Sequence, residues 1–373
     1  MNSIPDPNQK NAVTDGKITA PPLRNWRNGV LVRIPNQLSD AVMTFPALFE
    51  LKKILPKYCG LFVIIPGFMT QLFEALPIVD KTIPLRSTNT LWNKKERREV
   101  RQLRAGAIVL FNDSVKDIIS ARMSRVPKLF GFSNSGCDIL LSAKIARRSN
   151  PNNPEHHSPL AMQYLELVKL LGAGEWNGVL PRVSSRIATD ETDSQIRDIC
   201  RHPQILLVAP GSSGNQCWPA ENYRAAANYW IRHGGIVVVI GSASERILGD
   251  AVIQSLPRRK CFNLCGKTDF CALLHLFKSA AYTLAGDSGL MRLGITLDVH
   301  GLVPVGPPDF DKTDPVTAKW RILFSRTIHC KTGKKCQSGK CPGKPSARQV
   351  IREIRRAAAE LNFPFRKAAR KYS

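Results

Sequence analysis

Short apolar runs recur along the chain and predict strands that are buried on both faces of a sheet. These runs are VLVRI (30–34), LFVII (61–65), AIVLF (107–111), ILLVA (205–209), IVVVI (236–240), YTLA (282–285) and GLVPV (301–305). Between them lie amphipathic segments, such as 40–55 and 223–233, whose apolar residues recur near helical spacing. This alternation predicts an α/β protein in which parallel sheets are flanked by helices.

With 373 residues, the chain exceeds the length at which a single core stops growing, so we expect two domains. The polar stretch 181–195 has no periodicity and separates the two sets of runs. Ligands of such sheets bind beyond the carboxyl ends of the strands, so we expect a site in the cleft between the halves. We divide the chain into a disordered lead-in (1–28), a first Rossmann-like domain (29–180), a linker (181–199), a second Rossmann-like domain (200–341) and a basic C-terminal helix and tail (342–373).

The chain is strongly basic, because 54 Lys and Arg residues against 29 acidic ones give a net charge of +25. Such an excess attracts polyanions, whether nucleic acid, an anionic membrane or a phosphorylated substrate. No nucleic-acid-binding motif accompanies the charge, so we expect no specific nucleic acid as a partner. A nucleic-acid-binding protein is a second class of function, and only the net charge supports it.

The sequence also bears on the cellular compartment and on metal binding. No apolar run approaches the roughly 18 residues that a transmembrane helix needs, and the N-terminus lacks the plan of a signal peptide. The ten cysteines are scattered, mostly in apolar stretches, which favours reduced thiols in a cytoplasm. Cys330, Cys336 and Cys341 are spaced more widely than the ligands of structural zinc sites. We therefore predict no metal, while a metal at these three cysteines stays an open alternative.

The stretch LAGDSGLMRLG (284–294) allows two interpretations of Ser288. A serine-protease nucleophile would need a histidine base and an orienting carboxylate, and the Gly-Asp-Ser-Gly proteases are all-β, unlike this chain. The stretch also lacks the Gly-x-Ser-x-Gly of α/β-hydrolases. Alternatively, Asp287, Ser288 and Gly289 lie where a strand gives way to a helix, whose first N–H groups attract a phosphate. A simple helix cap by Asp or Ser accounts for the motif equally well.

Three separated segments resemble, in order and spacing, glycosyltransferase family 9, the ADP-heptose:lipopolysaccharide heptosyltransferases. Segment 30–56 has a strand, then a turn with an acidic residue, then a helix that begins near TFPAL, as in the family. Segment 208–230 has the family's Pro-Gly loop followed by Trp-Pro. Segment 263–294 has Gly-Lys-Thr and Asp-Ser-Gly, and GPPDF (306–310) resembles the family's Gly-Pro-Thr-Asp-Pro. The ordered set, spanning about 30–341, is more specific than any one of its members.

The resemblance implies a GT-B fold, in which the parallel sheets of two Rossmann-like domains face a central cleft. It implies an acceptor site on the N-terminal domain and a nucleotide-sugar site on the C-terminal one. The expected reaction is a metal-independent, inverting transfer of heptose or a related sugar from an ADP-sugar to the lipopolysaccharide core or lipid A. We expect no cofactor beyond that donor, and a cytoplasmic enzyme peripheral to the anionic inner membrane.

The resemblance also assigns roles to individual residues. Asp40 matches the acidic residue of the family's first turn and is the candidate base, although it would also serve as an N-cap. Glu245 and Thr268 match positions around the nucleoside, although each would serve equally as a cap or as an exposed loop residue. The other donor-side residues match the diphosphate site. The full donor-binding set is Ser212, Ser213, Gln216, Glu245, Thr268, Asp287, Ser288, Gly289 and Arg292.

Some positions depart from the family pattern. Gln216 replaces a lysine placed to neutralise diphosphate, and Ser39 replaces the glycine before the acidic residue. Arg292 replaces a histidine, and we expect it either to restore the lost positive charge or to pair with a neighbouring carboxylate. These departures indicate a different nucleotide-sugar, a weakened enzyme, or a GT-B protein that binds without turnover.

Two basic helices are expected at 93–104 and within the C-terminal stretch 344–373. The second begins at Ser346, a plausible N-cap, and is amphipathic. Either helix is suited to a phosphorylated acceptor or an anionic leaflet, or simply to exposure to solvent.

Overall fold

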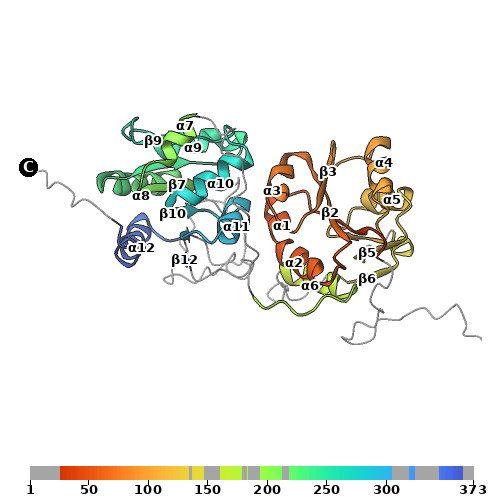
Figure 1. Ribbon diagram of the computed structural model, residues 1–373. Helices are drawn as coiled ribbons and strands as arrows, with labels where there is room; N and C mark the ends of the chain where they lie inside the picture. The colour runs from red at the N-terminus through yellow and green to blue at the C-terminus, as the bar shows by residue number, and fades with distance from the viewer. Residues whose placement is uncertain are drawn as a thin grey trace, which may run out of the picture.

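The computed structural model describes residues 26–133, 137–146, 160–178, 183, 194–211, 218–304, 319–323 and 344–363. These residues form two lobes, each built on a six-stranded sheet with helices around it (Figure 1). Every strand pairing in both sheets is parallel. The predicted α/β class with two parallel sheets is therefore confirmed.

The first sheet has the order β3-β2-β1-β4-β5-β6, with β1 buried along its whole length. Its strands are β1 (Gly29–Arg33), β2 (Gly60–Pro66), β3 (Lys81–Leu85), β4 (Ala107–Leu110), β5 (Lys128–Phe132) and β6 (Ala143–Ile145). Its helices are α1 (Leu38–Val42), α2 (Phe45–Ile54), η1 (Gly67–Met69), α3 (Thr70–Glu74), α4 (Lys94–Gln102), α5 (Val115–Met123), η2 (Asp138–Leu140) and α6 (Leu160–Lys169).

The second sheet has the order β12-β11-β10-β7-β8-β9. Its strands are β7 (Ile205–Ala209), β8 (Ile236–Val239), β9 (Cys261–Asn263), β10 (Ala280–Ala285), β11 (Gly301–Pro304) and β12 (Trp320–Leu323). Its helices are α7 (Ser194–Cys200), α8 (Ala220–Arg232), η5 (Ala243–Glu245), α9 (Arg246–Ile253), α10 (Phe270–Ser279), α11 (Gly289–Thr296) and α12 (Ala347–Glu360).

All seven predicted apolar runs form strands, because each supplies the unbroken apolar side chains that a sheet covered on both faces needs. The strands that prediction missed, β3, β5, β6, β9 and β12, are shorter or carry polar residues. They lie away from the centre of their sheets, where one-sided burial weakens the apolar pattern.

The helix expected over 40–55 is instead two helices, α1 and α2, with a break at Met43 and Thr44. Pro46 lies in the first turn of α2, where its missing N–H is harmless. In one continuous helix its ring would clash with the preceding turn. The Thr44 hydroxyl donates to the Ala41 carbonyl at 2.6 Å and closes α1. The break therefore leaves a five-residue helix directly after β1.

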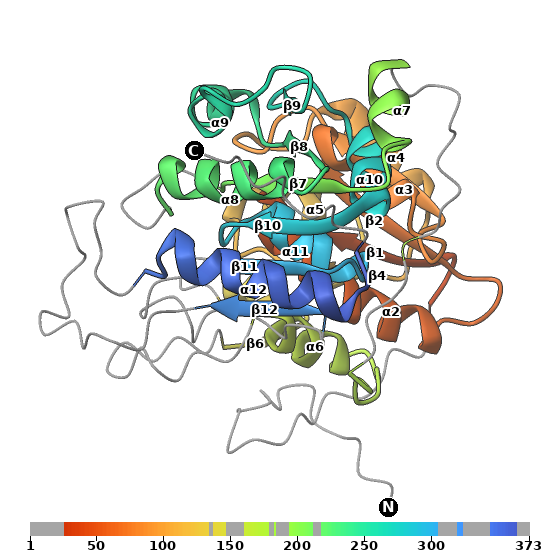
Figure 2. The same ribbon diagram turned by 90° about the vertical axis from the view of Figure 1, so that its left-hand side faces the viewer.

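The second lobe is closed by α12, which begins at the predicted Ser346 cap. Ser346 and Gln349 form a reciprocal capping box. The buried Val350 and Ile354 belong to the core cluster that also contains residues of α8, and α12 packs against α8 (Figure 2). The buried Trp218 donates from Nε1 to the Pro345 carbonyl at 2.7 Å, as expected of a residue that packs its loop. α7 extends into the end of the expected linker and packs against α10.

Six cysteines lie among the described residues, and all six are free thiols. This agrees with the expectation of reduced thiols for that part of the chain. The described ranges contain no helix with the length and apolar character of a membrane span. The predicted lead-in lies outside the described residues except for 26–28, as does most of the expected linker, and so do Cys330, Cys336 and Cys341.

Candidate active site

A cavity of about 620 Å³ lies where the two lobes meet. α1 and α3 of the first lobe face α11 and α10 of the second (Figure 1), and Phe270 N donates to Gln71 Oε1 across the junction at 3.2 Å. The cavity opens at the carboxyl ends of β1, β8 and β10, as expected for parallel sheets. Seven predicted site residues line it: Asp40, Glu245, Thr268, Asp287, Ser288, Gly289 and Arg292.

The structure thus brings most of the predicted residues together, while their chemical roles stay predictions. Ser212, Ser213 and Gln216 lie outside the described residues. The chain is described up to Gly211, whose φ is +82° and whose backbone passes beside Ser288. A Cβ on Gly211 would lie 3.6 Å from the Ser288 Cβ.

Asp40 lies in the first turn of α1 and does not cap that helix. The N-cap is Gln37, and its side chain makes no capping hydrogen bond. The half-buried Asp40 carboxylate accepts a hydrogen bond from Ser39 Oγ at 3.0 Å and lines the cavity. No other described residue donates to it. The capping interpretation is therefore wrong, and the carboxylate is available to a ligand.

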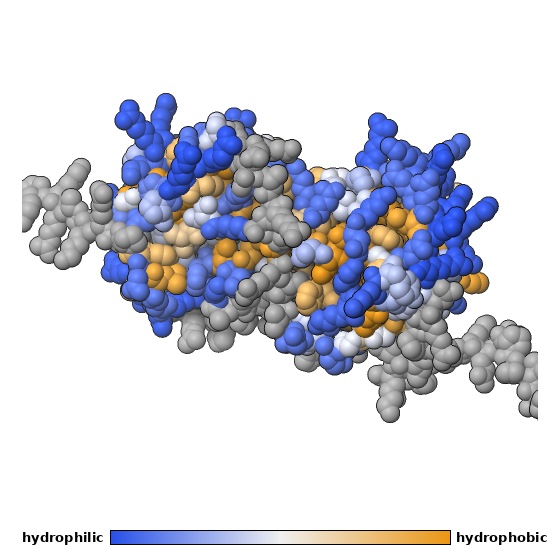
Figure 3. All heavy atoms as spheres, in the orientation of Figure 1, coloured by the Kyte–Doolittle hydropathy of each residue, from blue (hydrophilic) through white to orange (hydrophobic). Residues whose placement is uncertain are grey.

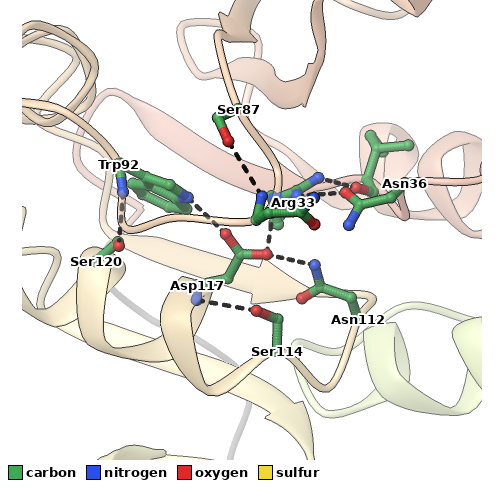
Figure 4. Close-up of polar contacts among 10 residues, drawn as sticks. Arg33, Asn36, Ser87, Trp92, Asn112, Ser114, Asp117 and Ser120 are labelled. Atoms are coloured by element: carbon green, nitrogen blue, oxygen red, sulfur yellow. Dashed lines mark hydrogen bonds and ion pairs between the residues drawn. The ribbon is translucent and has the colours of Figure 1, made fainter.

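A buried ion pair holds the turn that carries Asp40 (Figure 4). Arg33, the last residue of β1, is fully buried, and its Nε lies 3.0 Å from Asp117 Oδ2 on α5. Asp117 is 3% exposed and also accepts hydrogen bonds from Trp92 Nε1 at 2.6 Å and Asn112 Nδ2 at 2.5 Å. Burial lowers the pKa of the Arg33 guanidinium, while the charge of Asp117 acts in the opposite direction.

The same guanidinium reaches forward into the β1–α1 turn. Arg33 Nη2 donates to Asn36 Oδ1 at 2.6 Å, and Nη1 donates to the Ile34 carbonyl. Asn36 directly precedes the N-cap of α1. Arg33 therefore links α5 and the centre of the sheet to the turn, which fixes where α1 begins and where Asp40 lies.

Across the cavity, the N-terminus of α11 presents donors. Ser288 is its N-cap and accepts from Met291 N at 3.4 Å, a long hydrogen bond. Among the described residues, the N–H groups of Gly289 and Leu290 find no acceptor. The partial positive charge of a helix N-terminus adds to these donors. The helix start therefore both caps itself and faces the cavity with unused donors.

Gly289 also accounts for the close contact of the lobes. A Cβ at this position would lie 2.8 Å from Ser39 N and 3.0 Å from Leu38 Cβ, both on α1. Only a residue without a side chain permits this approach. Gly289 therefore lets the opposite lobe approach α11 closely.

Arg292 lies one turn into α11 and is the only cation among the described residues that line the cavity. Its side chain is 13% exposed, and its Nη2 lies 3.9 Å from Asp287 Oδ1. Its buried Nε has no hydrogen-bond partner. The pairing with a neighbouring carboxylate is thus loose, and a buried donor without a partner favours an anionic ligand.

Two further groups at this wall have structural roles. Glu245 Oε2 accepts from Ser242 N at 2.6 Å and from Ser242 Oγ at 2.7 Å, which caps η5. Beside it, burial and then the charge of Glu245 raise the pKa of the Cys265 thiol to about 11. Cys265 is therefore protonated near neutral pH and does not act as a nucleophile.

The sequence analysis missed several residues of the cavity, and most of them are apolar. They follow strand ends or begin helices, as the predicted residues do, but the apolar ones carry no group that gives a chemical signal. Phe68 is notable because it lies in η1, which directly follows β2, and is 62% exposed. The others are Gln37, Leu38, Ser39, Gly241, Ser242, Phe270, Leu273 and Leu290. Among the described residues, no group of three or more His, Cys, Asp or Glu side chains is arranged to hold a metal.

Comparison with known proteins points in one direction. The glycosyltransferase family 9 (heptosyltransferase) model matches residues 95–342, about two-thirds of the chain. Lipooligosaccharide heptosyltransferase 2 of Haemophilus influenzae is 25% identical over 309 residues, which cover 79% of this chain and 88% of that protein.

Two solved structures share the fold. ADP-heptose lipopolysaccharide heptosyltransferase II of Escherichia coli matches with a TM-score of 0.73 at 19% identity, covering 89% of this chain and 99% of that one. An E. coli heptosyltransferase with ADP-2-deoxy-2-fluoro heptose matches with a TM-score of 0.61 at 14% identity, covering 88% and 99%. The predicted GT-B fold is therefore confirmed.

The buried pair makes a direct prediction for stability. Asp117→Asn keeps the shape of the side chain but leaves Arg33 buried without a counter-charge. We expect the free energy of unfolding to fall by about 3–5 kcal/mol in urea denaturation. The control Asp198→Asn removes the exposed pair with Arg201 and should cost less than about 1 kcal/mol. Equal losses for the two variants would contradict the anchoring role of Arg33 and Asp117.

Proposed function

Because the chain belongs to glycosyltransferase family 9, the heptosyltransferase family, we propose that it transfers heptose from an ADP-linked donor to the lipopolysaccharide core. The observation that carries this proposal is the cavity between the lobes. It sets the carboxylate of Asp40 opposite a helix N-terminus and a cation, Arg292. The names of the relatives, which are lipooligosaccharide and lipopolysaccharide heptosyltransferases, support heptose as the sugar.

The two sides of the cavity fit the two ends of such a reaction. Asp40 accepts the proton of the acceptor hydroxyl as its oxygen attacks the anomeric carbon of the sugar. The bond from that carbon to the diphosphate breaks on the opposite face, so the configuration inverts. The leaving diphosphate takes the electron pair, and its charge is stabilised by Arg292 and the free N–H groups of Gly289 and Leu290.

The charge balance of the cavity supports this division of labour. Its described lining holds three carboxylates, Asp40, Glu245 and Asp287, and a single cation, Arg292. Glu245 is engaged in the η5 cap, and Asp287 lies 3.9 Å from Arg292. A bound diphosphate would therefore depend on Arg292 for its counter-charge. Binding of the diphosphate would loosen the contact between Arg292 and Asp287. Thr268 and Phe270 line this wall, where the nucleoside would lie in the proposed complex.

The acceptor and the surroundings follow from the same proposal. An acceptor carried on lipid A resides in a membrane, and the net charge of +25 attracts the protein to an anionic leaflet. We place the enzyme at the cytoplasmic face of the inner membrane. This charge would also raise the rate of encounter with a phosphorylated acceptor.

Asp40→Asn tests the base. Because asparagine cannot accept the proton, we expect kcat to fall by about 10²–10⁴-fold in a transfer assay with ADP-heptose and heptose-accepting core. Donor affinity by calorimetry should be unchanged. The control Ser39→Ala removes only the hydrogen bond to the carboxylate and should lower kcat by less than about tenfold. Full turnover by the asparagine variant would refute the role of Asp40.

Arg292→Ala tests the donor side. Loss of a charge-assisted contact to diphosphate should weaken ADP-heptose binding by about 10- to 100-fold in calorimetry. The control Lys267→Ala removes an exposed cation that is next to Thr268 in the chain but does not line the cavity. This variant should bind ADP-heptose as tightly as the wild type. An unchanged affinity of the Arg292 variant would show that the loose contact with Asp287 is its whole role. Tight donor binding by a wild type without turnover would instead indicate a binding protein.

A further inference from the structure

A second cavity, of about 810 Å³, lies at the amino ends of strands of the first sheet, whereas the interlobe cavity lies at their carboxyl ends. β1, β4 and β5 are parallel neighbours, so the residues that precede them meet at their amino ends. Arg27 precedes β1, Arg104 precedes β4 and Arg125 precedes β5, and all three line the cavity. The length of β1 separates this edge from the interlobe cavity by roughly 15 Å.

The basin, as we call this cavity, is rimmed by arginine. α4 adds Arg98 and Arg101 to the three that precede the strands, and no acidic residue belongs to the lining. In Figure 3 the surface over α4 and α5, at the end of the first lobe away from the second, is strongly hydrophilic. The floor is formed by the buried Val100, Ala105 and Val126, which belong to the packed core of the lobe.

The charge of the basin is not balanced within the described protein. Arg98, Arg104 and Arg125 make no ion pair there, and Arg101 Nη2 donates only to the Met123 carbonyl, at 3.2 Å. The C-termini of α4 and α5 end beside the basin, and each carries a partial charge of about −0.5. Leaving Arg27 aside, together they offset about one of the four positive charges of Arg98, Arg101, Arg104 and Arg125. The remainder is available to an anion.

The backbone conformation of three of these arginines decides how they can be substituted. Arg27, Arg104 and Arg125 have φ values of 49°, 50° and 60°, in the left-handed region. Arg104 and Arg125 directly follow the C-caps of α4 and α5, Leu103 and Ser124, a position where glycine is strongly preferred. A side chain is disfavoured in this conformation, so helix termination alone would be better served by glycine. Ser255, Asp298 and Asn362 adopt the same conformation directly after the C-caps of α9, α11 and α12, so the conformation is how several helices of this chain end.

We propose that the basin is a binding site for a ligand that carries two or more phosphate groups. Guanidinium groups form paired hydrogen bonds with phosphate oxygens, and several of them around one hollow suit clustered phosphates. The volume lies in the range of pockets for small molecules. Both an anionic lipid headgroup and a soluble polyphosphate present this chemistry. The site is separate from the interlobe cavity and does not depend on the transferase activity.

The double variant Arg104→Gly/Arg125→Gly tests this proposal without threatening the fold, because glycine relaxes both backbones. We expect its melting temperature to equal or exceed that of the wild type. Affinity for inorganic tripolyphosphate, measured by calorimetry, should fall by about tenfold or more. In flotation assays, binding to vesicles of phosphatidylcholine with phosphatidylglycerol should fall in the same variant, and vesicles of phosphatidylcholine alone should not bind.

Two controls separate the basin from general charge and from the interlobe cavity. Lys95→Ala/Arg122→Ala removes two charges from the same two helices outside the basin and should bind like the wild type. Arg292→Ala should keep the tripolyphosphate affinity of the basin. Loss confined to tripolyphosphate would identify a soluble ligand, and loss confined to vesicles a lipid headgroup. Wild-type binding of both probes by the glycine variant, or equal loss in the charge-matched control, would overturn the proposal.

Discussion

The buried ion pair between Arg33 and Asp117 is the constraint on which the first lobe depends. Removing two charges from water costs several kcal/mol per ion, and only good geometry with further hydrogen bonds recovers that cost. Here Trp92, Asn112 and Asn36 supply those bonds, so the pair is held in one arrangement. The pair joins the central strand to α5, and Arg33 also donates to Asn36 in the turn before α1, so one arginine sets the relative positions of all three.

The position of Asp40 in the site depends on this arrangement. Asp40 sits in a helix of only five residues, which has too few internal hydrogen bonds to be stable alone. The anchored turn on one side and the contact of Gly289 with α1 on the other hold it in place. The carboxylate of the first lobe therefore meets the helix N-terminus of the second at a distance that the backbone contact determines. A change in how the lobes meet would alter both halves of the site together.

Much of the site could be predicted because parallel sheets deliver their carboxyl ends to one place. Asp40, Glu245, Thr268 and Ser288 each follow a predicted or neighbouring strand, so topology alone brings them to one edge of each sheet. The central strands could be predicted from their apolar runs, because a strand buried on both faces carries few polar residues. The break between α1 and α2 was missed although Pro46 signals it, since the apolar residues on either side keep helical spacing.

Other features required the structure itself. An arginine at the end of the apolar run VLVRI was visible, but its partner Asp117 lies far along the chain, and nothing in the sequence joins the two. The sequence left open whether Glu245 is a cap, and the local turn shows that it is one. The arginine basin depends on strand order, because Arg27, Arg104 and Arg125 become neighbours only when β1, β4 and β5 are adjacent.

The central claim is that the cavity between the lobes transfers heptose, and the most direct measurement is the mass of the acceptor after reaction. The purified protein would be incubated with ADP-heptose and a heptose-accepting lipopolysaccharide core, and the products analysed by mass spectrometry. The account predicts an acceptor heavier by one heptose residue, with release of an equal amount of ADP. An acceptor of unchanged mass, with the donor intact, would contradict it.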